Sequence, residues 1–302
     1  MNKEKFNIGG QAVIEGVMMR APGQFTVAVR TSEGNITVRR ENISIDRNPF
    51  FKKPFLRGLI GIYDSLILGI KALNFSVQQS GVEGEKPITK KETALSLVLG
   101  FGLGILLFVF IPLWLTDLSK HIVPAVERSF LLFNAVDGII RVIFFVIYII
   151  IISRMKDIQR VFEYHGAEHK SIFAYEEEME LSVENARKMS RFHPRCGTSF
   201  LLIVMIVAII IFSMIPKDSA FIIKLASRIL FLPVIAGVSY EILKLSGKYS
   251  GNVIVKMLIT PGLWLQRLTT REPDDSQLEV AIISIKAALS EDNAQLDGIT
   301  YV

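Results

Sequence analysis

Long apolar stretches alternate with polar segments between residues 94 and 245 of the chain. Residues 94–115 contain no charged side chain, and a helix of this length crosses about 30 Å of hydrocarbon. Similar stretches follow at residues 133–153, 198–215 and 221–245. Charged residues interrupt the last of these, so it is the weakest. The pattern predicts a mainly α, polytopic α-helical membrane protein with about four transmembrane helices.

Basic residues gather on one side of these predicted spans. They are frequent before residue 94, within residues 154–195 and after residue 244, and sparse in the connections inside each span pair. The positive-inside rule therefore places both termini and the long middle segment in the cytosol, in a multi-pass protein of the cell (inner) membrane. Residues 1–20 lack the apolar core of a cleavable signal peptide, and a single cysteine suits a reducing compartment.

The N-terminal residues predict a small cytosolic β-unit. Residues 25–31 and 35–45 are rich in Val, Ile and Thr, as strands are. The intervening Glu33-Gly34-Asn35 is typical of a hairpin turn.

Two helices are predicted outside the spans. Residues 55–73 carry Arg57, Asp64 and Lys71 at intervals of seven, so the polar stripe is narrow, and we expect this helix to lie in the membrane interface or to pack against the bundle. Residues 81–86 are a predicted linker. Residues 276–289 predict a short docking helix, which begins at a capping box of Ser276 and Glu279.

The positive net charge of the chain could indicate binding to nucleic acid. The net charge is +5, the hydrophobic fraction is 50% and the pI is about 9.2. The basic residues are juxtamembrane, however, and no aromatic stacking platform accompanies Arg39, Arg40, Lys52 and Lys53. We therefore expect a lipid bilayer with anionic headgroups as partner and no nucleic acid.

The candidate chemistry begins with His165-Gly166-Ala167-Glu168-His169. On a helix this H-x-x-E-H spacing puts both imidazoles on one face, with Glu168 beside them. Imidazole nitrogen is a good ligand for a divalent metal, most readily zinc, and the neighbouring carboxylate can act as general base on water. The same residues could form an ordinary solvated helix, but the composition of the following segment favours a metal.

That segment is His193-Pro194-Arg195-Cys196, a tight turn closed by Gly197. His165, His169, His193 and Cys196 together would complete a tetrahedral site. Four protein ligands make a zinc site structural, whereas catalysis keeps one position open, so either His193 or Cys196 could stand outside the ligand set. Cys196 as a nucleophile with His193 as its base is a less favoured alternative.

Further polar residues could support the site. H-x-x-E-H is also the metal-site pattern of inverzincin peptidases, which supply a downstream glutamate as third ligand, and Glu241 is a candidate, although Lys244 or an arginine on a neighbouring helix is a simpler partner for it. Glu15 lies in an apolar, glycine-flanked setting and must pair with Arg20 or with the metal site. Arg20 or Arg195 could steady an anionic group.

Four stretches of sequence carry a wider resemblance. GGQAVIEGVMMR near the N-terminus, the central YHGAEHK and HPRCGTSF, and PGLWLQRLTTREPD toward the C-terminus resemble the bacterial YqhQ-type family. The members of this family are membrane proteins of unknown function, described as predicted metal-dependent enzymes. The resemblance covers nearly the whole chain and implies a metal-dependent activity, but it implies no substrate.

Two functions follow as hypotheses. The first is a zinc-dependent hydrolase at the cytosolic membrane surface, with His165 and His169 as ligands, His193 or Cys196 completing the site and Glu168 as base. The second is a non-catalytic membrane scaffold or binding protein with a structural metal. The substrate and any homo-oligomer are left open. The expected parts are the β-unit (1–54), an interfacial helix and linker (55–93), a first transmembrane hairpin (94–153), the cytosolic metal-site loop (154–197), a second hairpin (198–245) and a cytosolic C-terminal segment (246–302).

Overall fold

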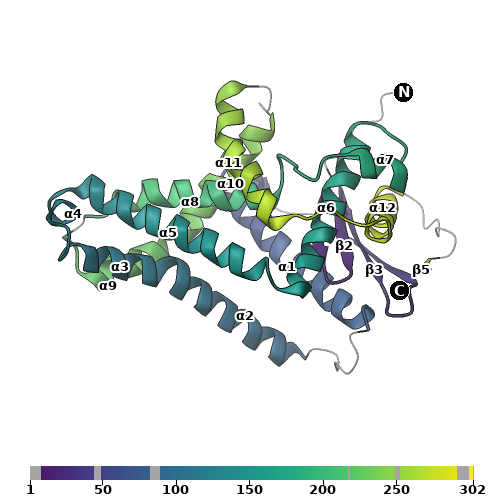
Figure 1. Ribbon diagram of the computed structural model, residues 1–302, viewed down its shortest axis with the longest axis horizontal. Coiled ribbons are helices and arrows are strands. Elements are labelled where there is room, and N and C mark those ends of the chain that lie inside the picture. The colour runs from purple at the N-terminus through teal and green to yellow at the C-terminus, as the bar shows by residue number, and fades with distance from the viewer. Residues whose placement is uncertain are drawn as a thin grey trace.

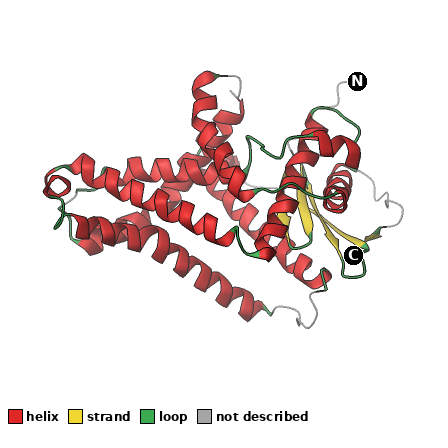
Figure 2. Ribbon diagram, viewed as in Figure 1, coloured by secondary structure: helices red, strands yellow, loops and turns green. Residues whose placement is uncertain are grey.

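A five-stranded sheet lies at one end of the molecule and long helices extend from it (Figures 1 and 2). The computed structural model describes residues 8–43, 49–81, 89–216, 218–248, 252–290 and 299–301. The strands are β1 (Gly9–Val13), β2 (Gly16–Ala21), β3 (Gln24–Arg30), β4 (Ile36–Asn42) and β5 (Thr300–Tyr301). They are ordered β1-β2-β3-β4-β5, with antiparallel pairing except that β5 runs parallel to β4.

The helices follow in chain order. They are α1 (Leu56–Gln79), α2 (Lys90–Ile105), α3 (Ile111–Ser119), α4 (Pro124–Arg128), α5 (Phe130–Ile152), α6 (Lys156–Glu176), α7 (Val183–Lys188), α8 (Gly197–Phe212), α9 (Phe221–Leu230), α10 (Leu232–Lys248), α11 (Val253–Thr269) and α12 (Asp275–Leu289), with a 3-10 turn at Pro49–Lys52. A π-helical turn, Leu106–Phe110, joins α2 to α3.

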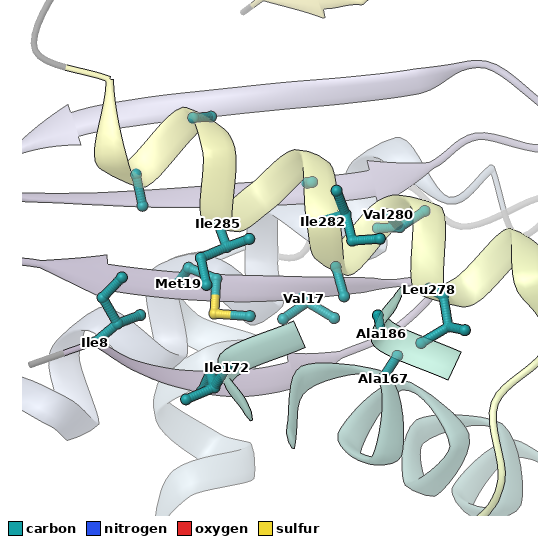
Figure 3. Close-up of a cluster of buried hydrophobic side chains, with 14 of the residues drawn as sticks. Ile8, Val17, Met19, Ala167, Ile172, Ala186, Leu278, Val280, Ile282 and Ile285 are labelled. Carbon is teal, nitrogen blue, oxygen red and sulfur yellow. The ribbon is translucent and has the colours of Figure 1, made fainter. Parts of the chain in front are cut away.

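Helices cover both faces of the sheet because side chains alternate along each strand. Val17 and Met19 point to the face covered by α6, α7 and α12, where Leu278 and Ile285 complete a buried core (Figure 3). Met18 points to the opposite face, which packs against α1. The sheet with these four helices forms the part of the molecule that we call the head.

The predicted hairpin is confirmed, and the sheet is larger than predicted. β3 and β4 are joined by a turn in which Gly34 has a φ of +87°. β1 and β2 were not expected, because Gly9, Gly10 and Gly16 weaken the strand pattern of their segment. The new hairpin turns at Glu15, whose φ is +53°.

Two helical segments of the described chain are long and apolar enough to cross a membrane, and a bent pair would make a third. The first is Lys91–Ser119, and only 6% of its most apolar 18-residue window is buried. The second is Phe130–Ile152. The predicted span at 221–245 is α9 and α10, bent by 45°. The predicted span at 198–215 corresponds to α8, which has only 16 residues.

Charged residues inside the helical bundle are paired. Asp137 accepts from Arg141 at 2.9 Å and also from Arg228 of α9 at 3.0 Å. Both arginines lie over the ring of Phe212, at 4.8 and 5.0 Å. This buried cluster ties α5, α8 and α9 together.

The helix predicted at 55–73 forms α1 and packs against α10 and the sheet, which is one of its two expected placements. α1 covers one face of the sheet. Two residues of its polar stripe form ion pairs: Arg57 with Glu241 of α10, and Lys71 with Glu41 of β4 at 3.0 Å. Most of the predicted linker, residues 82–86, lies outside the described residues.

The predicted docking helix forms α12, but its cap differs from the prediction. Asp274 accepts from the Gln277 N–H, and the Gln277 side chain accepts from the Asp274 N–H, so the capping box starts two residues earlier than Ser276. Aspartate caps a helix as well as serine does. Glu279 instead pairs with Arg30 of β3 at 2.6 Å.

Candidate metal centre

His165 and His169 lie on one face of α6, as their spacing predicts, with ring centroids 4.4 Å apart. Each ring is fixed through Nδ1. His165 Nδ1 donates to the carbonyl of Thr269 at 2.8 Å, and His169 Nδ1 donates to the carbonyl of Arg191 at 2.6 Å. Since a carbonyl can only accept, each Nδ1 carries a proton, and in the neutral imidazole each Nε2 then keeps its lone pair. Backbone carbonyls commonly orient metal-binding histidines in this way.

Cys196 completes a three-residue cluster with these imidazoles. Its Sγ lies 3.1 Å from His165 Nε2, and the three potential ligand atoms lie within 4.8 Å of one another. Cys196 is also the N-cap of α8, where the N–H and Oγ1 of Thr198 donate to the sulfur at 3.5 and 3.3 Å. A thiolate is the form of cysteine that binds a metal.

His169 Nε2 is the atom that best indicates a ligand position. It is buried and has no hydrogen-bond partner of normal geometry within the described part of the chain, although the Cys196 side chain is near enough to act on its pKa. Burial lowers the pKa of His169, which favours the neutral imidazole that metals require. A buried nitrogen without a partner is costly unless something binds it.

His193 lies beside this cluster but turns away from it. Its ring centroid is 5.6 Å from that of His169, while its Nε2 faces Glu176 at 3.4 Å and its Nδ1 accepts from the Arg195 N–H at 3.3 Å. The side-chain amide of Gln266 on α11 forms hydrogen bonds with the N–H and the carbonyl of His193. The four residues predicted from sequence are therefore neighbours, and three of them converge.

Glu168 is buried between the cluster and the edge of the sheet. Its carboxylate accepts from the backbone N–H groups of Gly10 and Ala12 on β1. Burial raises the pKa of Glu168 to about 7, although His165 and the two N–H donors act in the opposite direction. A Cβ at Gly10 would lie 2.8 Å from Glu168 Cγ, so a glycine is needed for this approach.

A cavity of about 730 Å³ opens between the head and the helical bundle. Glu168, His169, Cys196, His193 and Arg195 line it. The candidate base and two of the three candidate ligands therefore share one space that is large enough for a small ligand.

Gly166 allows the C-terminal chain to reach the site. The segment after α11 crosses α6 at this residue, where a Cβ would overlap the backbone oxygen of Arg271. The Arg271 N–H donates to the carbonyl of Phe162 at 2.8 Å. This close crossing brings the Thr269 carbonyl to His165.

The supporting carboxylates have partners other than a metal. Glu15 pairs with Arg160 of α6 and accepts from Tyr164 at 3.3 Å, so the predicted partners, Arg20 and the metal site, are corrected. Burial raises the pKa of Tyr164, so it stays a neutral donor. Glu241 accepts from Arg57 at 2.8 Å, which agrees with the simpler expectation of an arginine on a neighbouring helix.

The two remaining arginines differ in their relation to the site. Arg195 pairs with Glu176 at the cavity. Arg20 lies on β2 opposite Gly9.

Sequence reasoning missed Thr269, Arg191 and Gln266. Two of them act through backbone carbonyls, which leave no signal in side-chain identity. Gln266 lies on α11, a helix that was not predicted because Lys256 and Pro261 interrupt its apolar pattern.

Fold and site together define a mainly helical protein with an α/β head and a His-His-Cys cluster at its base. Residues 53–291 match the family model described as "Protein of unknown function (DUF1385)", and the chain belongs to this family. It is 37% identical, over 307 aligned positions and 94% of each chain, to "Uncharacterized protein YqhQ" of Bacillus subtilis (strain 168). No solved structure matches the chain.

Proposed function

We propose that this protein is a membrane-bound, zinc-dependent hydrolase that acts at the cytosolic membrane surface. The observation that carries the proposal is the convergence of His165, His169 and Cys196 within 4.8 Å, with the buried His169 Nε2 lacking a partner in the described chain. The donor set, two imidazoles and one thiolate, suits zinc.

The number of converging ligands favours catalysis over a purely structural metal. Zinc prefers four ligands, and three from the protein leave one for water or substrate. His193 could close the site, but its ring faces Glu176 and its backbone is held by Gln266. The scaffold alternative requires His193 to turn toward the other three residues.

A metal ion and two side chains of the cavity would serve the reaction. A zinc ion held there would supply Lewis-acid activation of water. Glu168 lines the cavity and would act as proton acceptor, and Arg195, which lines the same cavity and pairs with Glu176, would steady a negative group. Glu168 would have to share its carboxylate between this role and the N–H groups of β1.

The apolar surface of the helices supports a position in the membrane. Leu95, Val98, Leu99 and Phe101 of α2 are between 59% and 69% exposed. So much exposed apolar surface is costly in water and is satisfied by lipid. With the positive-inside rule, the head and the candidate centre then face the cytosol.

A second candidate function rests on the contact between Cys196 and His165. Their Sγ and Nε2 atoms are 3.1 Å apart, and the Thr269 carbonyl orients the imidazole. This is the arrangement of a thiol nucleophile with its base, so the chain could be a metal-independent thiol hydrolase. The base in this reading is His165 and not His193.

Metal analysis of the purified full chain tests these readings. We expect about one zinc ion per chain, lost from the His165→Ala/His169→Ala variant and retained by His121→Ala, which changes an exposed histidine outside the cluster. X-ray absorption should show two nitrogens, one sulfur and one oxygen. A third nitrogen in place of the oxygen would favour the scaffold. Absence of metal, with Cys196 alkylated faster in wild type than in His165→Ala, would favour the thiol enzyme.

A further inference from the structure

The cavity at the candidate centre has walls of two kinds. Gly10 and Ile172 line it from the head, whereas Tyr240, Leu243 and Lys244 line it from α10. α10 is the second half of the bent apolar pair. The cavity therefore lies where the head meets a candidate membrane segment.

α11 supplies a second indication that this junction is in contact with lipid. Its Val253, Met257 and Trp264 are 65%, 69% and 55% exposed, while Leu265 and Gln266 are buried. α11 packs on α8, which begins at the cavity with Gly197. An apolar face that ends in tryptophan is typical of a helix in the membrane interface.

Charge and apolar surface are combined within the cavity. Arg195 and Lys244 line it, and the Arg195 side chain is 42% exposed despite its pairing with Glu176. Ile8, Ile172 and Leu243 contribute apolar wall. A ligand that satisfies both features carries a negative group and a hydrocarbon part.

We propose that the cavity binds an anionic glycerophospholipid from the cytosolic leaflet, with its phosphate between Arg195 and Lys244 and its hydrocarbon along α10. The proposal rests on the proposed function, because it names the substrate class of the same site. A free phosphate compound shares the headgroup chemistry, so the test separates these two sources.

The single cysteine of the chain reports on the cavity, because Cys196 lines it. Metal-stripped full-length protein is placed in nanodiscs of phosphatidylcholine alone or mixed with phosphatidylglycerol, and alkylation of Cys196 by N-ethylmaleimide is followed by intact mass. The reagent is uncharged, so the surface potential of the disc does not change its concentration. A third sample contains phosphatidylcholine discs with glycerol 3-phosphate in solution.

We expect phosphatidylglycerol to slow alkylation several-fold and glycerol 3-phosphate to leave the rate unchanged. In Arg195→Gln and Lys244→Gln, the phosphatidylglycerol fraction that gives half-protection should rise about tenfold, which corresponds to about 1.4 kcal/mol. Lys188→Gln, which removes an exposed charge on α7, should behave as wild type. Native mass spectrometry gives a second readout: wild type should retain phosphatidylglycerol, and the two cavity variants should lose it.

Each other outcome overturns the lipid proposal. Equal protection by glycerol 3-phosphate would assign a soluble phosphate ligand, and equal protection in all four proteins would show a general membrane effect. Equal alkylation in both discs, with no retained phosphatidylglycerol, would exclude an anionic lipid. Because the protein is metal-stripped, these results are independent of zinc retention, so the hydrolase proposal and the lipid proposal can fail separately.

Discussion

Gln266 holds both backbone polar groups of His193. Its Oε1 accepts from the His193 N–H at 2.8 Å, and its Nε2 donates to the His193 carbonyl at 2.7 Å. One side chain of α11 thus fixes the turn that carries Cys196, three residues further along. The geometry of the candidate centre depends on a helix that contributes no ligand to it.

Gln266→Ala should therefore weaken both stability and metal binding. The substitution leaves the buried His193 N–H without its partner, at a cost of about 1–3 kcal/mol, and leaves the His193 carbonyl with only the Cys196 N–H, at 3.3 Å, among the described residues. Thermal unfolding and zinc titration of purified protein measure the two effects. Gln159→Ala, which changes a partly exposed glutamine of α6 whose side chain donates to the nearby Arg154 carbonyl, is the control, and equal behaviour of the two variants would contradict the role of Gln266.

Gly166→Ala should disrupt the centre without changing a ligand. The new methyl group would overlap the Arg271 carbonyl and push the Thr269 carbonyl away from His165. We expect loss of stability and at least about tenfold weaker zinc binding, in the range found when outer-shell partners of a metal ligand are removed. Gly104→Ala on α2 adds a methyl group into open space and should leave both unchanged. Normal zinc affinity in Gly166→Ala would show that this crossing is not needed.

Glu168→Gln separates the base from the ligands. The amide keeps the shape of the side chain but cannot accept a proton from water, so zinc should remain and function should be lost. Function can be scored as rescue of a deletion phenotype. Loss of zinc would make Glu168 a ligand or an anchor, and full rescue by a zinc-bearing variant would favour the scaffold.

Asp137→Ala should destabilise the bundle strongly. It leaves Arg141 and Arg228 buried without their shared carboxylate, and breaking a buried ion pair in this way costs about 3–5 kcal/mol. Combining Asp137→Ala with Arg141→Met and Arg228→Met should restore much of the loss, because no buried charge is then unpaired. Unfolding in detergent provides the measurement. A triple variant as unstable as the single one would show that the carboxylate has another role.

Cysteine accessibility tests the orientation. An impermeant thiol reagent applied to intact cells should label Ala220→Cys, in the connection before α9, and should not label Glu177→Cys, after α6. The wild-type chain, with its buried Cys196, gives the background. The reverse pattern would place the candidate centre outside the cytosol.

Local pattern predicted the elements whose signal lies within a few residues. Helical spacing placed His165 beside His169, and the turn at Gly34 identified the β3–β4 hairpin. Because the three histidines and Cys196 lie in one short segment of the sequence, Cys196 was predicted to lie beside the imidazoles. These features depend on residues that are close together in the sequence, so one sequence is enough to predict them.

Long-range contacts account for what was missed. Glu15 pairs with Arg160, which lies 145 residues away in the sequence. Nothing in the sequence of either segment indicates that the two side chains meet. His193 was expected as a ligand because it is near Cys196, but contacts from Gln266 and Glu176 set its direction. The bend between α9 and α10 likewise could not be read from hydropathy alone.

The head is made from both ends of the described chain, which constrains its synthesis. The sheet face that carries Val17 and Met19 is covered by α12, and β5 pairs with β4. A ribosome therefore completes the first four strands and all the long apolar helices before the covering helix emerges. During that interval α6 and α7 cover only part of the apolar face, and the part that α12 buries stays exposed. Completion of the head is thus a late event in translation, because it requires α12.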